Sequence, residues 1–147
     1  MSVDARLNEA HLIVAPGPLA GPVLGRVVGM LTARADCPID RLDDALLIAD
    51  AIAARAGSFS ADGRIGVLVS AQIGAVELNV GPLHEDGAQQ LIASAALPGV
   101  GNVLERVADE LLPEHRDGDG DGEYLRIRMA FGAAARASKA TGGTDAT

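Results

Sequence analysis

The residues of this chain that could act on a substrate or hold a metal are few and lie far apart. The three histidines, His11, His84 and His115, are never one helical turn from one another, and the single cysteine, Cys37, has no second cysteine or histidine nearby. A metal site needs several ligands that converge on one point, and these spacings supply none locally. The sequence therefore predicts no metal and no cofactor. Cys37 is interpreted as a small half-buried residue, with a reactive thiol as the alternative.

An acidic, glycine-rich stretch at 117–122 is the strongest local signal for a ligand. Its sequence, Asp-Gly-Asp-Gly-Asp-Gly, places carboxylates at the first, third and fifth positions and glycine at the sixth, as an EF-hand calcium loop does. Such a loop needs a bidentate glutamate at its twelfth position, where this chain has Arg128. The stretch is therefore interpreted as a flexible acidic turn, with a calcium site as the alternative.

Two further features could bind a ligand or a partner. Gly99 and Gly101 precede a predicted helix, whose N-terminal N–H groups could hold a phosphate, but Gly-x-Gly before a helix is more often a plain turn. Arg126 and Arg128 alternate with apolar residues in a predicted strand, and Glu77 lies on the same face of another strand. These charges predict a solvated sheet face, with a protein-binding face as the alternative.

Composition narrows the classes of function. The chain has 147 residues and 12 Lys+Arg against 20 Asp+Glu, and its formal net charge is -8. This length predicts one domain with a core of its own, and the acidic charge excludes nucleic acid or an acidic membrane as the main partner. No apolar run reaches the roughly 20 residues that a membrane-spanning helix needs. Residues 1–8 lack the basic and apolar parts of a signal peptide, so a cytoplasmic location is expected.

Apolar periodicity predicts the elements that must position these residues. Strands are expected at 11–14, 64–70, 75–80 and 124–131. Helices are expected at 19–34, 41–56, 86–96 and 101–112. Asp40 is expected to cap the second helix, Gly57 to end it in a left-handed conformation, and Pro113 to end the last helix. The core face of the second helix is expected to hold Leu42, Ala45, Leu46, Ala49, Ile52 and Ala53.

The alternation in the strands predicts the layers of the fold. In the segments 75–80 and 124–131 apolar residues alternate with polar and charged residues, as in a sheet covered on one face only. We therefore expect an α+β two-layer sandwich, in which a mixed, mostly antiparallel sheet carries helices on one face. The domain is expected to span 10–132, with an N-terminal extension over 1–9 and a disordered tail over 133–147.

Three stretches give the chain a likeness to a known family. The helix at 41–51 (RLDDALLIADA), the strand at 76–80 (VELNV) and the glycine-led helix at 99–109 (GVGNVLERVAD) follow one another in a characteristic order. This order resembles the anti-sigma-factor serine kinases of bacteria, in the histidine-kinase-like (GHKL) ATPase superfamily. The stretches are similar to the N-box helix, the strand before the adenine box, and the second glycine box of that family. The resemblance covers about residues 10–131 and implies a GHKL, or Bergerat-like, fold.

The positions that should carry the family's chemistry differ here. The family's N box, Glu-x-x-x-Asn, supplies a general base and a magnesium ligand, and this chain has Ala51 and Arg55 at those positions. Alanine cannot accept a proton, and arginine cannot ligate a cation. The aspartate of the adenine box falls at Pro82, or at Asn79 in a shifted register. The positions that the resemblance then assigns to nucleotide binding are Asn79, Gly81, Gly99 and Gly101.

These differences favour binding over catalysis. Without the base and the metal ligand, Mg·ATP-dependent phosphoryl transfer has no machinery, so no catalytic residue is assigned. The resemblance implies a transcription-regulating domain that binds a sigma factor or a STAS-type anti-anti-sigma protein, and a possible homodimer. One alternative is an active serine kinase that uses Asp50 and phosphorylates an anti-anti-sigma partner. Another is a different two-layer fold, and Arg55 leaves ATP or ADP binding without magnesium open.

Overall fold

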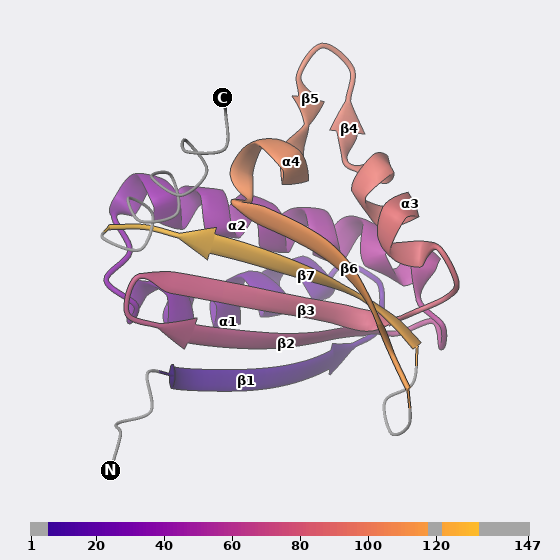
Figure 1. Cartoon of the computed structure of the whole chain (residues 1–147), viewed down its shortest axis with the longest axis horizontal. Coiled ribbons are helices and arrows are strands. Elements are labelled where there is room, and N and C mark those ends of the chain that lie inside the picture. Colours follow the sequence, from indigo (N-terminus) through magenta and orange to yellow (C-terminus); the bar gives the residue numbers. More distant parts are fainter. Residues whose placement is uncertain (1–5, 118–121, 133–147) are drawn as a thin grey trace, which may run out of the picture.

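The computed structural model of this chain describes residues 6–117 and 122–132. Five strands form one sheet in the order β1-β2-β3-β7-β6, and two long helices cover one face of it (Figure 1). The strands are β1 (Arg6–Val14), β2 (Ile65–Gln72), β3 (Ala75–Leu83), β6 (Glu110–Arg116) and β7 (Gly122–Ala130). The helices are α1 (Ala20–Ala33), α2 (Ile39–Arg55), the 3-10 turn η1 (Ala56–Phe59), α3 (Gly87–Ser94) and α4 (Val103–Val107). A small hairpin is formed by β4 (Ala96–Leu97) and β5 (Gly101–Asn102).

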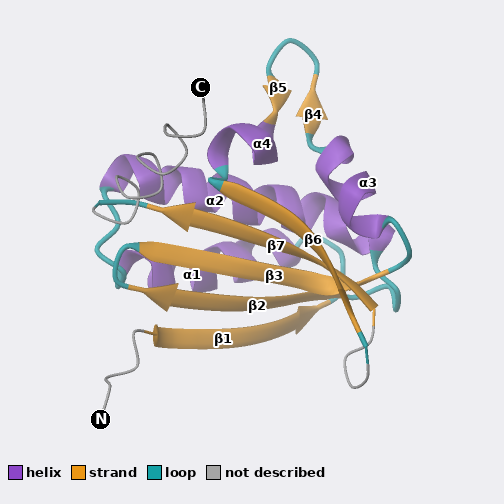
Figure 2. Ribbon diagram, in the orientation of Figure 1, coloured by secondary structure: helices purple, strands orange, loops and turns teal. Residues whose placement is uncertain are grey.

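The architecture confirms an α+β two-layer sandwich and corrects the expected sheet type. All four strand pairs of the main sheet are antiparallel, so the prediction of a mixed sheet is wrong. The connection between β1 and β2 explains this difference. The chain leaves β1, runs out along α1 and returns along α2, so β2 starts near the end of β1 and runs antiparallel to it (Figure 2).

The core lies between the helices and the sheet. Along α1 and α2 the fully buried side chains recur every three or four residues, as a helix with one apolar face requires. The inward side chains of β2, β3 and β7 complete the layer. The largest fully buried side chains include Leu24, Val28, Ile48, Ile52, Ile65, Val67, Leu78, Leu91, Leu104, Leu125, Ile127 and Met129.

The strand register defines which polar residues face away from the helices. Val69 on β2 pairs with Leu78 on β3, and both are buried in the core. The next pair along, Leu68 and Asn79, points to the opposite face, because side chains alternate along a strand. This second face carries no helix and is called here the open face (Figure 2). The hairpin and the alternation predicted from the sequence are thus confirmed.

Both ends predicted for the second helix need correction. α2 begins at Ile39 with Pro38 as its N-cap residue, and no side chain caps it. Asp40 therefore lies inside the first turn. Its negative charge interacts favourably with the positive end of the helix dipole, but its side chain makes no capping hydrogen bond. Gly57 continues into η1 without a left-handed conformation. A Cβ atom at Gly57 would lie 2.6 Å from Cγ of Pro16, so close packing requires glycine there.

The predicted helix at 101–112 is wrong over most of its length. α4 covers only Val103–Val107, and Ala108 is already extended. The next residue, Asp109, donates its backbone N–H to the Arg128 carbonyl and accepts hydrogen bonds from Ala130 N (2.7 Å) and Arg41 Nη2 (2.9 Å). These bonds turn the chain into β6. Pro113 lies within β6, where an edge strand tolerates its missing N–H.

The first strand is longer than the apolar pattern indicated. β1 begins at Arg6 and pairs with β2 from Arg6–Gln72 to Val14–Ile65. Residues 6–9, expected in an N-terminal extension, are therefore part of the sheet. The predicted tail at 133–147 and most of the acidic turn, residues 118–121, lie outside the described residues.

Candidate functional site

The two positions that the resemblance assigns to an N box lie on α2 at a small hollow on the helical side of the sheet. Ala51 and Arg55 line a cavity of about 160 Å³ together with Ala95, Leu97 and Val103. Asp50 also borders it, but its Oδ1 lies near α1, 3.6 Å from the place of a Cβ on Gly21. The side chain of Arg55 makes no hydrogen bond or ion pair with any residue that the structure describes.

The predicted adenine-box positions lie on the other side of the sheet. Asn79 is on the open face, where its Oδ1 accepts a hydrogen bond from Arg116 Nη2 at 3.1 Å. Gly81 packs against Tyr124, and a Cβ at this glycine would overlap the tyrosine ring. The structure therefore does not bring Asn79 and Gly81 together with Ala51 and Arg55, because the sheet separates them.

The two predicted phosphate-binding glycines form a turn. Gly99 lies in the turn between β4 and β5 and Gly101 begins β5, and their φ angles of 74° and 96° favour glycine. This hairpin projects beside α3 and α4, away from the main sheet (Figure 1). Asn102 holds its base: Nδ2 donates to the Ile92 carbonyl at 2.6 Å, and Oδ1 caps α4 by accepting from Glu105 N. The alternative that these glycines serve a plain turn accounts for their geometry.

The outer surface of the helical layer carries the most exposed large apolar side chains of the two long helices. They are Leu19 beside α1, Val23 and Met30 on α1, and Ile39, Leu46 and Leu47 on α2. Leu46 was predicted to face the core, but it is 37% exposed, and Ile48 occupies the core instead. A helical period of 3.6 residues places both residues near the boundary of the apolar stripe, so the sequence alone did not separate them.

A groove runs along the same outer surface between α1 and α2. Its volume is about 470 Å³. Gly21 and Gly25 of α1 form one wall, and a Cβ on Gly25 would meet nothing within 4 Å. The remaining lining residues are Asp43, Leu46, Leu47 and Asp50 of α2. The groove is therefore apolar and acidic, and no lysine or arginine lines it among the described residues.

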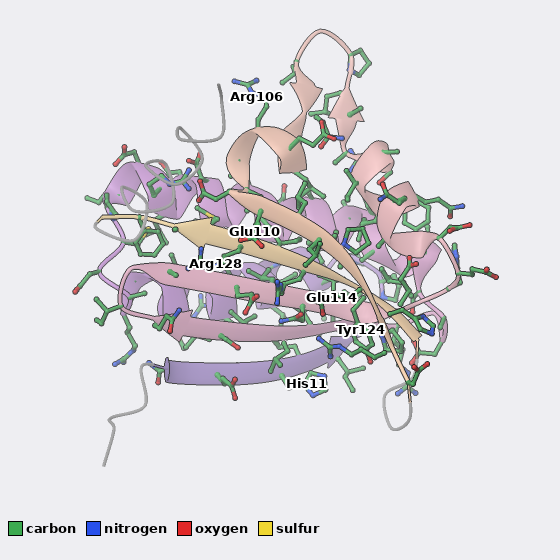
Figure 3. All side chains as sticks on the ribbon, in the orientation of Figure 1. His11, Arg106, Glu110, Glu114, Tyr124 and Arg128 are labelled. Atoms are coloured by element: carbon green, nitrogen blue, oxygen red, sulfur yellow. The ribbon has the colours of Figure 1, made fainter. Side chains whose placement is uncertain are left out.

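The open face of the sheet carries a network of ion pairs. Arg126 lies 3.1 Å from Glu77, 3.2 Å from Glu114 and 3.8 Å from Glu110, so three carboxylates from β3 and β6 surround one guanidinium. Figure 3 shows Glu110, Glu114 and Arg128 on this face. Such partly exposed pairs contribute little to stability, and they fit a solvated surface.

The three histidines lie on different elements of the described structure and do not approach a common point. His11 is on β1 and faces the open side of the sheet, His84 follows β3, and His115 on β6 lies 3.3 Å from Asp117. No group of three or more His, Cys, Asp or Glu in the described ranges could hold a metal ion. Arg128, at the twelfth position of the acidic stretch, lies within β7.

Cys37 is half-buried at the start of α2, as the sequence predicted. Its Sγ lies 3.3 Å from the Pro38 carbonyl oxygen, to which the thiol donates. Burial raises the pKa of the thiol, and the nearby carboxylates of Asp40 and Asp44 act in the same direction against the guanidinium of Arg41.

The raised pKa of the Cys37 thiol predicts that this thiol is alkylated slowly. Because the thiolate is the reactive form, the folded protein at neutral pH should be alkylated by iodoacetamide more slowly than the same chain unfolded in urea. The pH at which the alkylation rate reaches half of its maximum should also be higher for the folded protein than for the unfolded chain. An equal rate in the two states would contradict the geometry at Cys37.

No described helix is long and apolar enough to cross a membrane. No family model matches this chain, and no curated protein matches it.

Proposed function

We propose that this chain is a cytoplasmic regulatory domain of the anti-sigma type that binds protein partners and transfers no phosphate. The observation that carries the proposal is the exposed apolar surface of α1 and α2 beside their acidic groove. The partner class, a sigma factor or a STAS-type anti-anti-sigma protein, comes from the three stretches of sequence that resemble the GHKL anti-sigma kinases. The helical hairpin on one face of the sheet agrees with a two-layer α+β domain of this kind, whereas the wholly antiparallel sheet differs from the mixed sheet expected for it.

The outer helical surface has the chemistry of a docking site. Ile39 is 82% exposed and Leu47 is 50% exposed, and burial of such side chains gains about 25 cal/mol per Å² of apolar area. Clustered apolar side chains at a surface mark interaction sites more often than scattered ones do. Gly21 and Gly25 leave the groove wall without side chains, so a partner can approach the backbone of α1 closely.

The charges of the groove indicate which partner fits. Asp43 and Asp50 line it without a basic neighbour in the lining, so a segment with apolar and basic side chains on one face would complement it. Charge complementarity of this kind raises the association rate and weakens with salt. A partner of opposite charge also agrees with the net charge of -8.

Biolayer interferometry with immobilised protein tests this function. The analytes are the sigma factors and STAS-type proteins of the source genome, added one at a time without nucleotide. We expect at least one of them to bind with a Kd near or below about 1 μM, and to bind more weakly as salt is raised. If none of them binds, the proposed function is wrong.

A nucleotide titration is predicted to give no magnesium-dependent binding. At the N-box positions, Ala51 offers no ligand atom and the Arg55 guanidinium repels a cation, so no metal can bridge to a phosphate there. Calorimetry with ATP and ADP, each with and without Mg²⁺, should show no magnesium-dependent heat up to millimolar nucleotide. Magnesium-dependent binding in the micromolar range would instead support the alternative of an active serine kinase.

A further inference from the structure

A second hollow lies on the open face of the sheet, at the opposite side of the molecule from the α1–α2 groove. Its volume is about 210 Å³. The five strands of the main sheet and the turn before β2 all contribute residues to its lining. Figure 3 shows His11 and Tyr124 on this face. The lining side chains that matter for binding are His11, Arg64, Leu68, Asn79, Arg116 and Tyr124. We call this cavity the arginine hollow.

Arg116 is held in place before any ligand arrives. Its guanidinium carbon lies 4.1 Å from the centroid of the Tyr124 ring, and its Nη2 donates to Asn79 Oδ1 at 3.1 Å. Glu114 Oε2 lies 3.7 Å from the same nitrogen. An arginine has five N–H donors in a planar fork, so most of them stay available to an oxyanion. A fixed side chain also loses less entropy when it binds a ligand.

Arg64 reaches the same hollow from a tightly bonded turn. Asp62 Oδ1 accepts hydrogen bonds from Arg64 N and from the Ser60 hydroxyl, both at 2.9 Å. These bonds hold the pKa of Asp62 below its ordinary value, the Arg64 N–H contributing most. The turn is fastened to the end of β3 by Ala61 N, which donates to the Pro82 carbonyl at 3.0 Å.

The side chain of Arg64 is available for a ligand. It makes no hydrogen bond or close ion pair with another residue in the described part of the chain, although its charge attracts the Asp62 carboxylate and helps to lower the Asp62 pKa. Among the described lining residues, two guanidiniums and the imidazole of His11 face a single carboxylate, that of Asp62, which the turn already engages. This basic spot is unusual on a chain with a net charge of -8. Gly66 and Gly81 also line the hollow, and the absence of a Cβ at Gly81 lets the Tyr124 ring pack directly on the backbone of β3.

We propose that the arginine hollow binds a phosphate monoester. A phosphate group carries close to two negative charges at neutral pH and accepts paired hydrogen bonds from a guanidinium, which matches Arg64 and Arg116. The organic group of the ester would lie against Leu68 and the Tyr124 ring, the apolar part of the lining. This function is separate from partner binding on the outer helical surface, because the two sites lie on opposite faces.

The test is an NMR titration of the full chain with phenyl phosphate. We expect saturable shifts of the amide signals of His11, Asn79 and Tyr124, with a Kd of about 1 mM or lower. Arg64→Gln should weaken binding about tenfold, and Arg116→Gln at least as much. The matched control is Arg26→Gln on the exposed side of α1, which should leave the affinity unchanged.

Three results would overturn the proposal. They are no saturation up to about 10 mM phenyl phosphate, an equal loss of affinity in Arg26→Gln and Arg64→Gln, or sulfate binding as tightly as the ester. Because Arg116 also bonds Asn79, the decisive variant is Arg64→Gln, whose side chain makes no hydrogen bond within the described structure and interacts with Asp62 through its charge alone. A short phosphoserine peptide distinguishes the sources: tighter binding than phenyl phosphate indicates a phosphorylated protein, and weaker binding a small metabolite.

Discussion

Replacing Ile52 by alanine is expected to lower the free energy of unfolding by about 2–5 kcal/mol. Ile52 lies on α2 and is fully buried between the helical layer and the sheet. The substitution removes buried methylene and methyl groups and leaves a cavity that the tightly packed core can fill only in part. Urea denaturation followed by circular dichroism measures the loss. A loss of this size is a large fraction of the stability of a domain of this length.

Ile39 supplies the matched control on the same helix. It is the first residue of α2 and 82% exposed, so Ile39→Ala should change the free energy of unfolding by no more than about 0.5 kcal/mol. The substitution is chemically identical, so the two variants differ only in burial and position. Similar losses in both, or a small loss in Ile52→Ala, would mean that α2 does not pack on the sheet as described.

Leu47→Asp is expected to weaken partner binding at least about tenfold. Leu47 is half exposed at the edge of the α1–α2 groove, so the change should cost the free protein little. In the complex it would place a carboxylate against an apolar surface and beside Asp43 and Asp50. Burial of an unpaired charge is strongly unfavourable. Interferometry against the partner identified with the wild-type protein gives the change in Kd.

The control for this prediction lies on the open face. Leu112 on β6 is 40% exposed, so Leu112→Asp makes the same chemical change on the other side of the molecule. It should leave the affinity for the partner within about twofold. If Leu112→Asp weakens binding and Leu47→Asp does not, the partner docks on the sheet, and the assignment of the helical surface is wrong.

The sequence predicted best those elements in which apolar residues recur at a single spacing, either that of a helix or that of a strand. The bounds of α1 and of the β2–β3 hairpin agree with the predicted ranges to within three residues, because each element buries one face against the core. The segment at 101–116 failed because two periods overlap there. Val103, Val107 and Leu111 repeat as in a helix, while the residues of β6 alternate as in a strand. The contact of Asp109 with β7 decides between them, and the sequence does not reveal it.

The candidate sites were predictable only in part. Ala51 and Arg55 were correctly placed on a helix, and the two glycines in a turn could be foreseen as an alternative. The position of Asn79 on the open face could be predicted, because side chains alternate between the two faces of a strand and the neighbouring Val80 was assigned to the core face. The arginine hollow could not be predicted, because Arg64 and Arg116 are 52 residues apart and meet only through the pairing of four strands. Such long-range pairing leaves no local signal.

Partner binding and phosphoryl transfer can be measured together in a single mixture. The protein is incubated with its cognate sigma factor or STAS-type partner, with and without Mg·ATP, and the mixture is analysed by size-exclusion chromatography and intact-mass spectrometry. We expect the same amount of complex in both conditions and no phosphate on the partner. A phosphorylated serine on the partner, or a complex that forms only with Mg·ATP, would contradict it.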